Sequence, residues 1–217
     1  MSHRPDRILL FGGTFDPPHR AHTELPPLVA DQLDCDRLIY IPTSANPLKD
    51  DRPTDARHRL KMLRLAIESV PGAEIDPVEL EQAGPSYTVN TLRALRERYG
   101  PEVDLRLLIG SDQAANFHRW HEARTILQLA RPAVMLRPPA DHESLRRDLS
   151  DHWSEKEVAD WLRCAVEVPE VAVSATEIRR RLQAGEPVDD LLAPAVADYI
   201  RRHGLYGAAA RQASSRR

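Results

Sequence analysis

The chain has 217 residues, 41% of them hydrophobic and 29% charged, which is enough to bury one sizeable core. Because 30 Lys and Arg residues stand against 33 Asp and Glu, the formal net charge of -3 argues against a general nucleic-acid or membrane surface, so any anion site must be local. The two cysteines have no metal-ligand spacing, so we expect neither a disulfide framework nor a metal site of the protein's own. The start lacks the apolar core of a signal peptide, and no apolar run reaches about 20 residues. We therefore expect a cytoplasmic protein without a membrane span.

A phosphate-binding segment is predicted near the start of the chain, where an apolar run, a glycine pair and a helix start follow one another. Residues 8–11 form a short apolar run typical of a buried strand. Gly12 and Gly13 then let backbone N–H groups approach a ligand without interference from a Cβ atom. Asp16 can cap the helix that follows, and Pro17 suits its first position because a missing N–H needs no partner there.

Two histidines of this predicted helix can meet the same anion. His19 and His22 are three residues apart, so a helix that contains both places them on one face. That face lies at the positive end of the helix dipole, where anions bind. Taken alone, a glycine turn followed by histidines is more often an ordinary surface feature, so the segment needs support from elsewhere in the chain.

The rest of the chain alternates predicted strands and helices. Pro26 and Pro27 predict a kink or a restart in the first helix. Further strands are expected at 37–42, 105–109, 133–136 and 165–168, with weaker candidates at 73–76 and 78–81. Helices are expected at 54–69 with Thr54 as the cap, at 89–99, after Gly110, at 154–162 after a loop from Arg137, from Ser174 to Gly185, and at 194–202.

This order of elements predicts the fold class. Strand and helix alternation implies parallel strands with right-handed crossovers, so we expect an α/β, Rossmann-like doubly wound parallel sheet with helices on both faces and a small C-terminal helical part. Ligands of such sheets lie outside the carboxyl ends of the strands. We expect one domain over residues 1–206 and a disordered tail over residues 207–217, which are small, polar and basic.

Two further segments carry side chains suited to phosphate. Lys49 lies on a polar loop after the predicted strand at 37–42, although a loop lysine by itself is more often merely solvated. Ser174 and Thr176 place hydroxyl groups at a predicted helix start, with Arg179 one turn inside. A planar guanidinium can donate two parallel hydrogen bonds to oxyanions, and the helix dipole adds to the attraction. The plain alternative is an N-cap followed by a surface arginine.

Both ends of the chain resemble one superfamily. Residues 12–22, Gly-Gly-Thr-Phe-Asp-Pro-Pro-His-x-x-His, resemble the first signature of the nucleotidyltransferases, with Ala21 where that family usually has glycine. Residues 174–179 resemble the second half of the signature, and the two segments come in the family's order. The resemblance implies catalytic roles for His19, His22, Lys49 and Arg179. It implies ATP binding by Gly12, Gly13, Thr14, Phe15, Gly110, Asp112, Ser174 and Thr176.

Three more segments resemble the nicotinate-nucleotide adenylyltransferases within that superfamily. They are the Ser-Tyr-Thr element at 86–92, the Gly-x-Asp and Trp-His elements at 110–121, and the carboxyl terminus at 190–206. The resemblance implies that Thr88 and His121 receive the ring carboxylate of a nicotinate nucleotide through backbone amides, while Trp120 stacks on its ring. Asp112 would contact a ribose or the nucleotide, and is otherwise an ordinary helix cap.

The function implied is adenylyl transfer from ATP to nicotinate mononucleotide, with Mg²⁺ bound through the ATP phosphates. The alternatives are transfer to nicotinamide mononucleotide or to phosphopantetheine, and a nucleotide-binding module without turnover. Departures from the family pattern at Ala21, Leu48 and Asn90 favour the last alternative, whereas the intact histidines, Lys49 and the Ser-x-Thr-x-x-Arg segment count against it. The sequence leaves open whether the chain forms a homo-oligomer.

Overall fold

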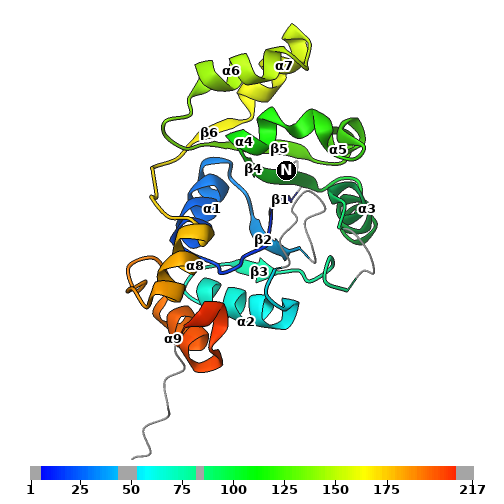
Figure 1. The fold of residues 1–217 in the computed structure, drawn as a ribbon. Coiled ribbons are helices and arrows are strands. Elements are labelled where there is room, and N and C mark those ends of the chain that lie inside the picture. The colour runs from blue at the N-terminus through cyan, green and yellow to red at the C-terminus, as the bar shows by residue number, and fades with distance from the viewer. Residues whose placement is uncertain (1–5, 44–52, 82–85, 209–217) are drawn as a thin grey trace, which may run out of the picture. The chain divides into compact units, whose positions relative to one another are not determined.

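Apolar runs between residues 7 and 167 form one parallel sheet. The computed structural model describes residues 6–43, 53–81 and 86–208. The sheet has the order β3-β2-β1-β4-β5-β6, and every neighbouring pair of strands is parallel (Figure 1). Its strands are β1 (Arg7–Gly13), β2 (Arg37–Pro42), β3 (Ala73–Ile75), β4 (Asp104–Gly110), β5 (Arg131–Leu136) and β6 (Ala165–Glu167). This is the doubly wound strand order, so the predicted fold class is confirmed.

The chain divides into two units. The first, called here the sheet unit, consists of Met1–Thr14, Leu25–Arg52 and Gly72–Glu170, and contains all six strands. The second, called here the helical unit, consists of Phe15–Glu24, Pro53–Pro71 and Val171–Arg217. A single domain over residues 1–206 stays a prediction, and most of the predicted tail lies outside the described residues.

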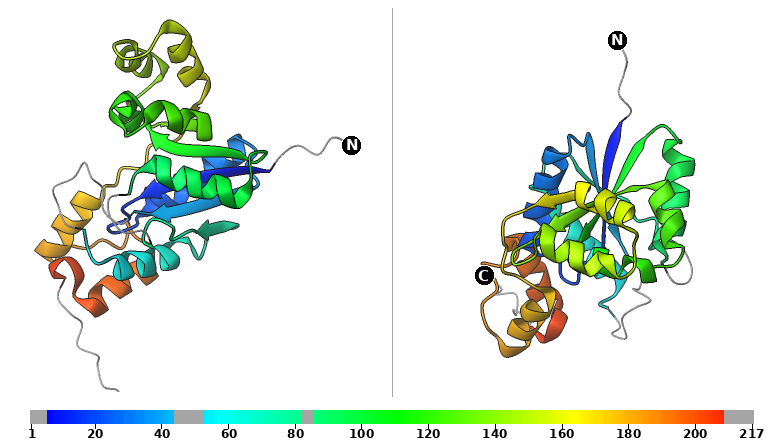
Figure 2. Two further views of the ribbon diagram at one scale, coloured as in Figure 1. Left: turned by 90° about the vertical axis from the view of Figure 1, so that its right-hand side faces the viewer. Right: turned by 90° about the horizontal axis from the view of Figure 1, so that it is seen from above.

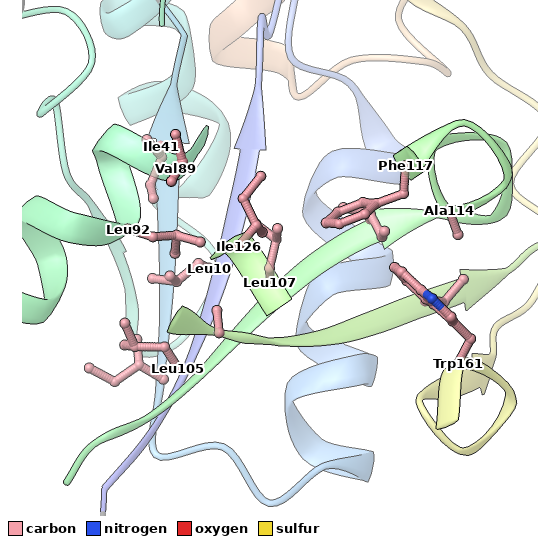
Figure 3. Close-up of a cluster of buried hydrophobic side chains, with 14 of the residues drawn as sticks. Leu10, Ile41, Val89, Leu92, Leu105, Leu107, Ala114, Phe117, Ile126 and Trp161 are labelled. Carbon is pink, nitrogen blue, oxygen red and sulfur yellow. The ribbon is translucent and has the colours of Figure 1, made fainter. Parts of the chain in front are cut away.

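Helices pack on both faces of the sheet within the sheet unit. Seen from above, the part of α1 that begins at Leu25 and the helix α3 lie on opposite sides of the strands (Figure 2). Figure 3 shows part of the core of this unit, which includes Leu92 and Leu107 and, further along the sheet, the contacting rings of Phe117 and Trp161. The helices of this unit are α3 (Thr88–Tyr99), α4 (Ser111–Ala115), η1 (Phe117–Arg119), α5 (Ala123–Leu129), α6 (His142–Ser150) and α7 (Glu155–Arg163).

Two expectations for this unit are wrong. The loop expected after Arg137 contains the helix α6, which Asp141 caps by accepting a hydrogen bond from the backbone N–H of Ser144 at 2.7 Å. The weak strand candidate at 78–81 is a turn instead. Asp76 stabilises that turn because its Oδ1 accepts a hydrogen bond from the Val78 N–H at 3.0 Å.

The first helix differs from its prediction in both start and continuity. Helix α1 is a single helix over Arg20–Gln32, so it begins three residues after Pro17, and Pro26 and Pro27 lie inside it. Proline fixes φ near a helical value and so permits continuation, at the cost of lost backbone hydrogen bonds. Complete burial of Leu25 and Val29 on this helix offsets that cost.

Four helical segments and the first turn of α1 form the helical unit, and the predicted C-terminal helical part is confirmed. The segments are α2 (Ala56–Ile67), α8 (Ala175–Ala184), α9 (Pro194–His203) and η2 (Leu205–Gly207). Their apolar faces share a core that includes Met62, Ile178, Val196 and Ile200. Asp55 caps α2 in place of the predicted Thr54. None of the described helices is long and apolar enough to cross a membrane.

Candidate functional site

The predicted glycine turn is the end of strand β1. Gly12 and Gly13 pair with Ile41 and Pro42 of β2, and the Gly13 carbonyl accepts a hydrogen bond from the Thr43 N–H at 2.9 Å. The prediction of a turn at the glycine pair is therefore wrong, because the ladder continues through both residues. An added Cβ at Gly12 would meet nothing within 4 Å, and the role of Gly12 in ligand binding stays a prediction. The backbone there is open to close approach by a ligand.

The second glycine segment lies at the carboxyl end of β4, the strand next to β1. The strand order reverses between these two strands, which is where doubly wound sheets bind ligands. Gly110 ends β4, and its N–H donates to Gln113 Oε1 at 3.0 Å. A Cβ on Gly110 would lie 2.5 Å from Asp112 Oδ1 and 3.0 Å from Arg137 Nη2, so a larger residue here would displace these two side chains.

Asp112 is an exposed carboxylate beside an arginine. The plain alternative of a helix cap is wrong, because Gly110 precedes the first helical residue and Asp112 lies within α4. Its Oδ1 lies 3.6 Å from Arg137 Nη2. Sequence reasoning missed Arg137, although its position directly after β5 places it at the same edge of the sheet. The pair forms a polar, charged contact at the carboxyl edge.

The Ser-Tyr-Thr and Trp-His elements come together in the sheet unit. The Tyr87 and His121 rings have their centroids 4.6 Å apart. Trp120 stacks on Phe117 with centroids 4.8 Å apart and 24° between the planes. Thr88 begins α3, and that helix is tied to the start of α5 by hydrogen bonds of 3.1 and 2.6 Å from Arg93 to the two oxygens of Glu122. The tertiary structure thus joins two segments that the sequence separates by about thirty residues.

A buried carboxyl group lies beside the Ser-Tyr-Thr element, and the sequence contains no signal for it. Glu79 is 5% exposed, and its Oε1 accepts a hydrogen bond from Thr91 Oγ1 at 2.7 Å. Thr91 is itself buried, on the inner face of α3. Burial raises the pKa of Glu79, and the hydrogen bond from Thr91 opposes the rise.

The two predicted catalytic histidines stack on each other in the helical unit. Their ring centroids are 3.7 Å apart with 20° between the planes, and Phe15 meets the His22 ring edge-on at 5.1 Å. The backbone N–H of His19, the residue before α1, donates to His22 Nδ1 at 3.2 Å. This hydrogen bond places the proton of a neutral His22 ring on Nε2, which makes that atom a donor for an anion.

The second signature segment contacts the first. Ser174 caps α8, because its Oγ accepts a hydrogen bond from the Glu177 N–H at 3.2 Å. Arg179 donates from Nη1 to the carbonyl oxygen of Asp16 at 2.8 Å and from Nη2 to Thr176 Oγ1 at 3.4 Å. Both acceptors are neutral, so these contacts leave the charge of the guanidinium available to an anion.

The neighbouring arginines of α8 differ from Arg179. Arg180 makes paired hydrogen bonds to the carboxylates of Glu177 and Glu186, with lengths of 2.9 to 3.0 Å. Arg181 donates to Glu177 Oε1 at 2.9 Å. These pairs neutralise two of the three consecutive arginines, which leaves Arg179 as the one suited to bind phosphate.

Asp16 does not cap α1, which corrects the expectation for this residue. Its Oδ2 accepts a hydrogen bond from the Thr54 N–H at 3.0 Å, and its Oδ1 accepts one from the Tyr206 hydroxyl. Arg59, only 1% exposed, donates from Nε to the Thr54 carbonyl at 2.8 Å. Burial lowers the pKa of Arg59, and the charge of Asp16 opposes that shift. Sequence reasoning missed both Arg59 and the contact of Tyr206.

Several predicted features are not tested by the structure. Lys49 and Leu48 lie outside the described residues. Within the described ranges, no group of three or more His, Cys, Asp or Glu side chains could hold a metal ion. The cationic and hydroxyl groups around Arg179 suit a phosphate, and a hard cation bound to that phosphate would need few protein ligands.

Comparison with known proteins adds the family. A family model described as cytidylyltransferase-like matches residues 10–181. The chain is 38% identical over 208 residues to a probable nicotinate-nucleotide adenylyltransferase of Chromobacterium violaceum, covering 92% of this chain and 98% of the relative. It is equally similar, at 38% over 201 residues, to a protein of the same description from Bacillus pumilus, covering 92% of this chain and 98% of that relative.

A solved structure supports the fold alone. Plasmodium falciparum nicotinic acid mononucleotide adenylyltransferase complexed with NaAD has a TM-score of 0.73 to this chain at 17% sequence identity. The match covers 93% of this chain and 98% of that one. The doubly wound architecture is therefore shared over nearly the whole length.

Proposed function

We propose that this chain transfers the adenylyl group of ATP to nicotinate mononucleotide. The chain belongs to the cytidylyltransferase-like family and, within it, to the nicotinate-nucleotide adenylyltransferases. In that activity the 5′-phosphate of nicotinate mononucleotide attacks the α-phosphorus of ATP. A new phosphorus–oxygen bond forms, the bond between the α- and β-phosphates breaks, and pyrophosphate leaves. The other product is nicotinate adenine dinucleotide, the deamido form of NAD.

The reaction requires alignment and charge neutralisation more than acid–base chemistry. The attacking phosphate is already ionised near neutral pH, so no protein nucleophile is needed and a general base adds little. The barrier falls when positive groups stabilise the charge on the transferred phosphorus and on the leaving pyrophosphate. Magnesium, bound through ATP oxygens, supplies part of that charge.

In this proposal Arg179 of the helical unit and Lys49 supply the remaining positive charge, and His19 and His22 donate hydrogen bonds to the phosphates. His22 donates from Nε2, because its Nδ1 already accepts a backbone hydrogen bond. Arg179 is held by two neutral acceptors and keeps its charge for a phosphate oxygen. Ser174 adds a capping hydroxyl at the start of α8, and Thr176 adds a hydroxyl that accepts a hydrogen bond from Arg179.

The nucleotide acceptor is assigned to the sheet unit. Trp120 offers an aromatic face to the pyridine ring, a stack worth about 0.5 to 1.5 kcal/mol beyond burial. The backbone amides near Thr88 and His121 receive the ring carboxylate. Asp112 of the same unit is assigned to ATP binding, where it contacts a ribose or the nucleotide. The contact between the Tyr87 and His121 rings supports this assignment, because it brings the two elements to one place.

The observation that carries the proposal is the hydrogen bond from Arg179 to the Asp16 carbonyl, 163 residues away in sequence. It joins the two halves of the signature into one cationic cluster. The test is pyrophosphate release by the purified protein with ATP, Mg²⁺ and each of three acceptors in turn. We expect nicotinate mononucleotide to give a higher kcat/KM than nicotinamide mononucleotide, and phosphopantetheine to give no turnover. ATP binding without pyrophosphate release for any acceptor would instead indicate a nucleotide-binding module.

A further inference from the structure

The carboxyl-terminal turn of the chain reaches back to the first signature segment. The Tyr206 hydroxyl donates to Asp16 Oδ1 across 190 residues of sequence. Tyr206 has φ of +56°, in the left-handed region that non-glycine residues adopt at a cost of about 1 kcal/mol. The hydroxyl contact is one reason for such a conformation to persist, because strained residues need support from their surroundings.

Asp16 accepts hydrogen bonds through both its side-chain carboxylate and its backbone carbonyl oxygen. Its carboxylate accepts from Tyr206 and, at 3.0 Å, from the Thr54 N–H. Its carbonyl oxygen accepts from Arg179 at 2.8 Å. A carboxylate held from two directions fixes the rotation of the residue, and with it the direction in which the carbonyl points. The same backbone leads within three residues to His19.

We propose that Tyr206 is a positioning residue for adenylyl transfer: its hydroxyl orients Asp16, which in turn orients Arg179 and the backbone that carries the two histidines. This inference rests on the proposed function for its kinetic consequences. Tyr206 itself touches neither the histidines nor Arg179 through a hydrogen bond among those between described residues, so it acts through Asp16.

The environment of Tyr206 suits a permanent donor. Burial and the negative charge of Asp16 both raise the pKa of the phenol, so the hydroxyl keeps its proton throughout the working range of pH. A hydrogen bond between a neutral donor and a carboxylate is stronger than one between two neutral groups. The contact therefore holds Asp16 without itself titrating.

A matched control exists in the same unit. The Tyr199 hydroxyl lies 2.9 Å from His58 Nδ1, and Tyr199 packs in the core of the helical unit. Tyr199→Phe thus removes one hydrogen-bonded phenol from the helical unit without touching Asp16. Any general effect of losing such a group on stability appears in both variants, whereas an effect on catalytic geometry appears in only one.

The kinetic test compares Tyr206→Phe with Tyr199→Phe. We expect Tyr206→Phe to lower kcat by roughly tenfold, the loss typical of one hydrogen bond to a charged group, while KM for nicotinate mononucleotide changes little. Tyr199→Phe should keep kcat close to that of the wild type at a similar shift in Tm. Equal kcat values for the two variants and the wild type would overturn the inference.

A double-mutant cycle tests the route through Asp16. Asp16→Asn replaces the charged acceptor, so adding Tyr206→Phe to it should lower kcat much less than Tyr206→Phe does in the wild type. Additive losses would mean that Tyr206 does not act through Asp16, which contradicts the inference.

A spectroscopic readout separates this inference from the proposed function. The imidazole NMR resonances of His19 and His22, recorded without substrate, should shift in Tyr206→Phe and stay in place in Tyr199→Phe. If the wild type released no pyrophosphate with any acceptor, the proposed function would fail, yet these shifts would still decide whether Tyr206 positions the histidine segment. Unchanged resonances in Tyr206→Phe would reject it.

Discussion

The imidazole rings of His19 and His22 lie parallel at 3.7 Å, with the His19 backbone N–H bonded to His22 Nδ1. This arrangement directs one protonated nitrogen of His22 away from the backbone. A phosphate that accepts from this nitrogen meets a donor whose orientation is already set before binding. Under the proposed function the stack is thus a preorganised anion-binding face rather than two independent histidines.

Removal of the His22 ring should therefore lower turnover far more than stability. We expect His22→Ala to reduce kcat for pyrophosphate release by about a hundredfold or more, the usual loss for a preorganised donor, while thermal unfolding stays cooperative. The matched control is His152→Ala, which removes a ring from the other close histidine stack, His118 on His152 at 3.6 Å. A wild-type rate in His22→Ala would remove this imidazole from the mechanism.

A methyl group at Gly110 should disturb nucleotide binding through Asp112. In Gly110→Ala the new Cβ would collide with Asp112 Oδ1 at 2.5 Å and press on Arg137 Nη2 at 3.0 Å. Both are ends of flexible side chains, so the fold adapts while the carboxylate moves. We expect a several-fold rise in KM for a nucleotide substrate, measured by initial rates, with a small change in Tm. If the displaced Asp112 is the cause, Gly110→Ala should add little to the effect of Asp112→Ala.

The buried Glu79 should make stability fall as pH rises. Its pKa is raised by burial in the folded state, so ionisation opposes folding above the unfolded value of 4.5. Relative to the wild type, Glu79→Gln should gain stability from about pH 4.5 upward and level off above the folded pKa. Urea unfolding over a pH series measures this difference.

The opposite sign is expected at Glu74, which serves as the control. Arg37 donates to both of its oxygens at 2.8 and 2.7 Å, and these hydrogen bonds lower the pKa of Glu74 below 4.5. The stabilisation from this pair is present above the unfolded pKa and is lost as pH falls through the folded one. Glu74→Gln should thus be less stable than the wild type at neutral pH and approach it in acid. The same pH trend in both variants would contradict the assignment.

Both cysteines should react slowly with thiol reagents in the folded protein. Burial raises the pKa of Cys35 to about 11 and also raises that of Cys164. At pH 8 the thiolate fraction of Cys35 is then roughly a hundredfold below that of a thiol of pKa 9.0. Reaction with a disulfide reagent should accelerate strongly when the protein is unfolded in guanidinium. Equal rates in the two states would show that burial does not control these thiols.

Local patterns in the sequence were sufficient for the fold class and for most elements. The apolar runs that became β1, β2, β4 and β5 are short and continuous, as expected for strands buried on both faces. Helix ends could be predicted where a glycine adopts the left-handed conformation that ends a helix. Gly100, Gly185 and Gly204 are such residues, and all have positive φ. The helix α6 was missed because a polar, amphipathic segment gives a weak apolar signal, although Asp141 and Ser144 mark its start.

The path of the backbone around Asp16 could not be predicted from local sequence rules. A helix start at Pro17 satisfied every local rule, yet the helix begins at Arg20, and Pro26 and Pro27 lie inside it. Packing of Leu25 and Val29 outweighs the proline penalty, and such burial depends on residues far away in sequence. Local propensity favours a break at the prolines, whereas long-range packing favours a continuous helix, and the packing effect is the larger.

The sequence by itself determined which residue types were candidates for the chemistry: the glycines at the end of β1, the two histidines, and the Ser-x-Thr-x-x-Arg segment with its capped helix start. Only the tertiary structure decided their partners. The contacts of Asp16 with Arg179 and Tyr206 span 163 and 190 residues, and that of Tyr87 with His121 joins the residue before α3 to the turn before α5. Hydrogen bonds and ring contacts between residues so far apart in sequence depend on how whole helices and strands pack. No local sequence pattern specifies which distant side chain will contact a given residue.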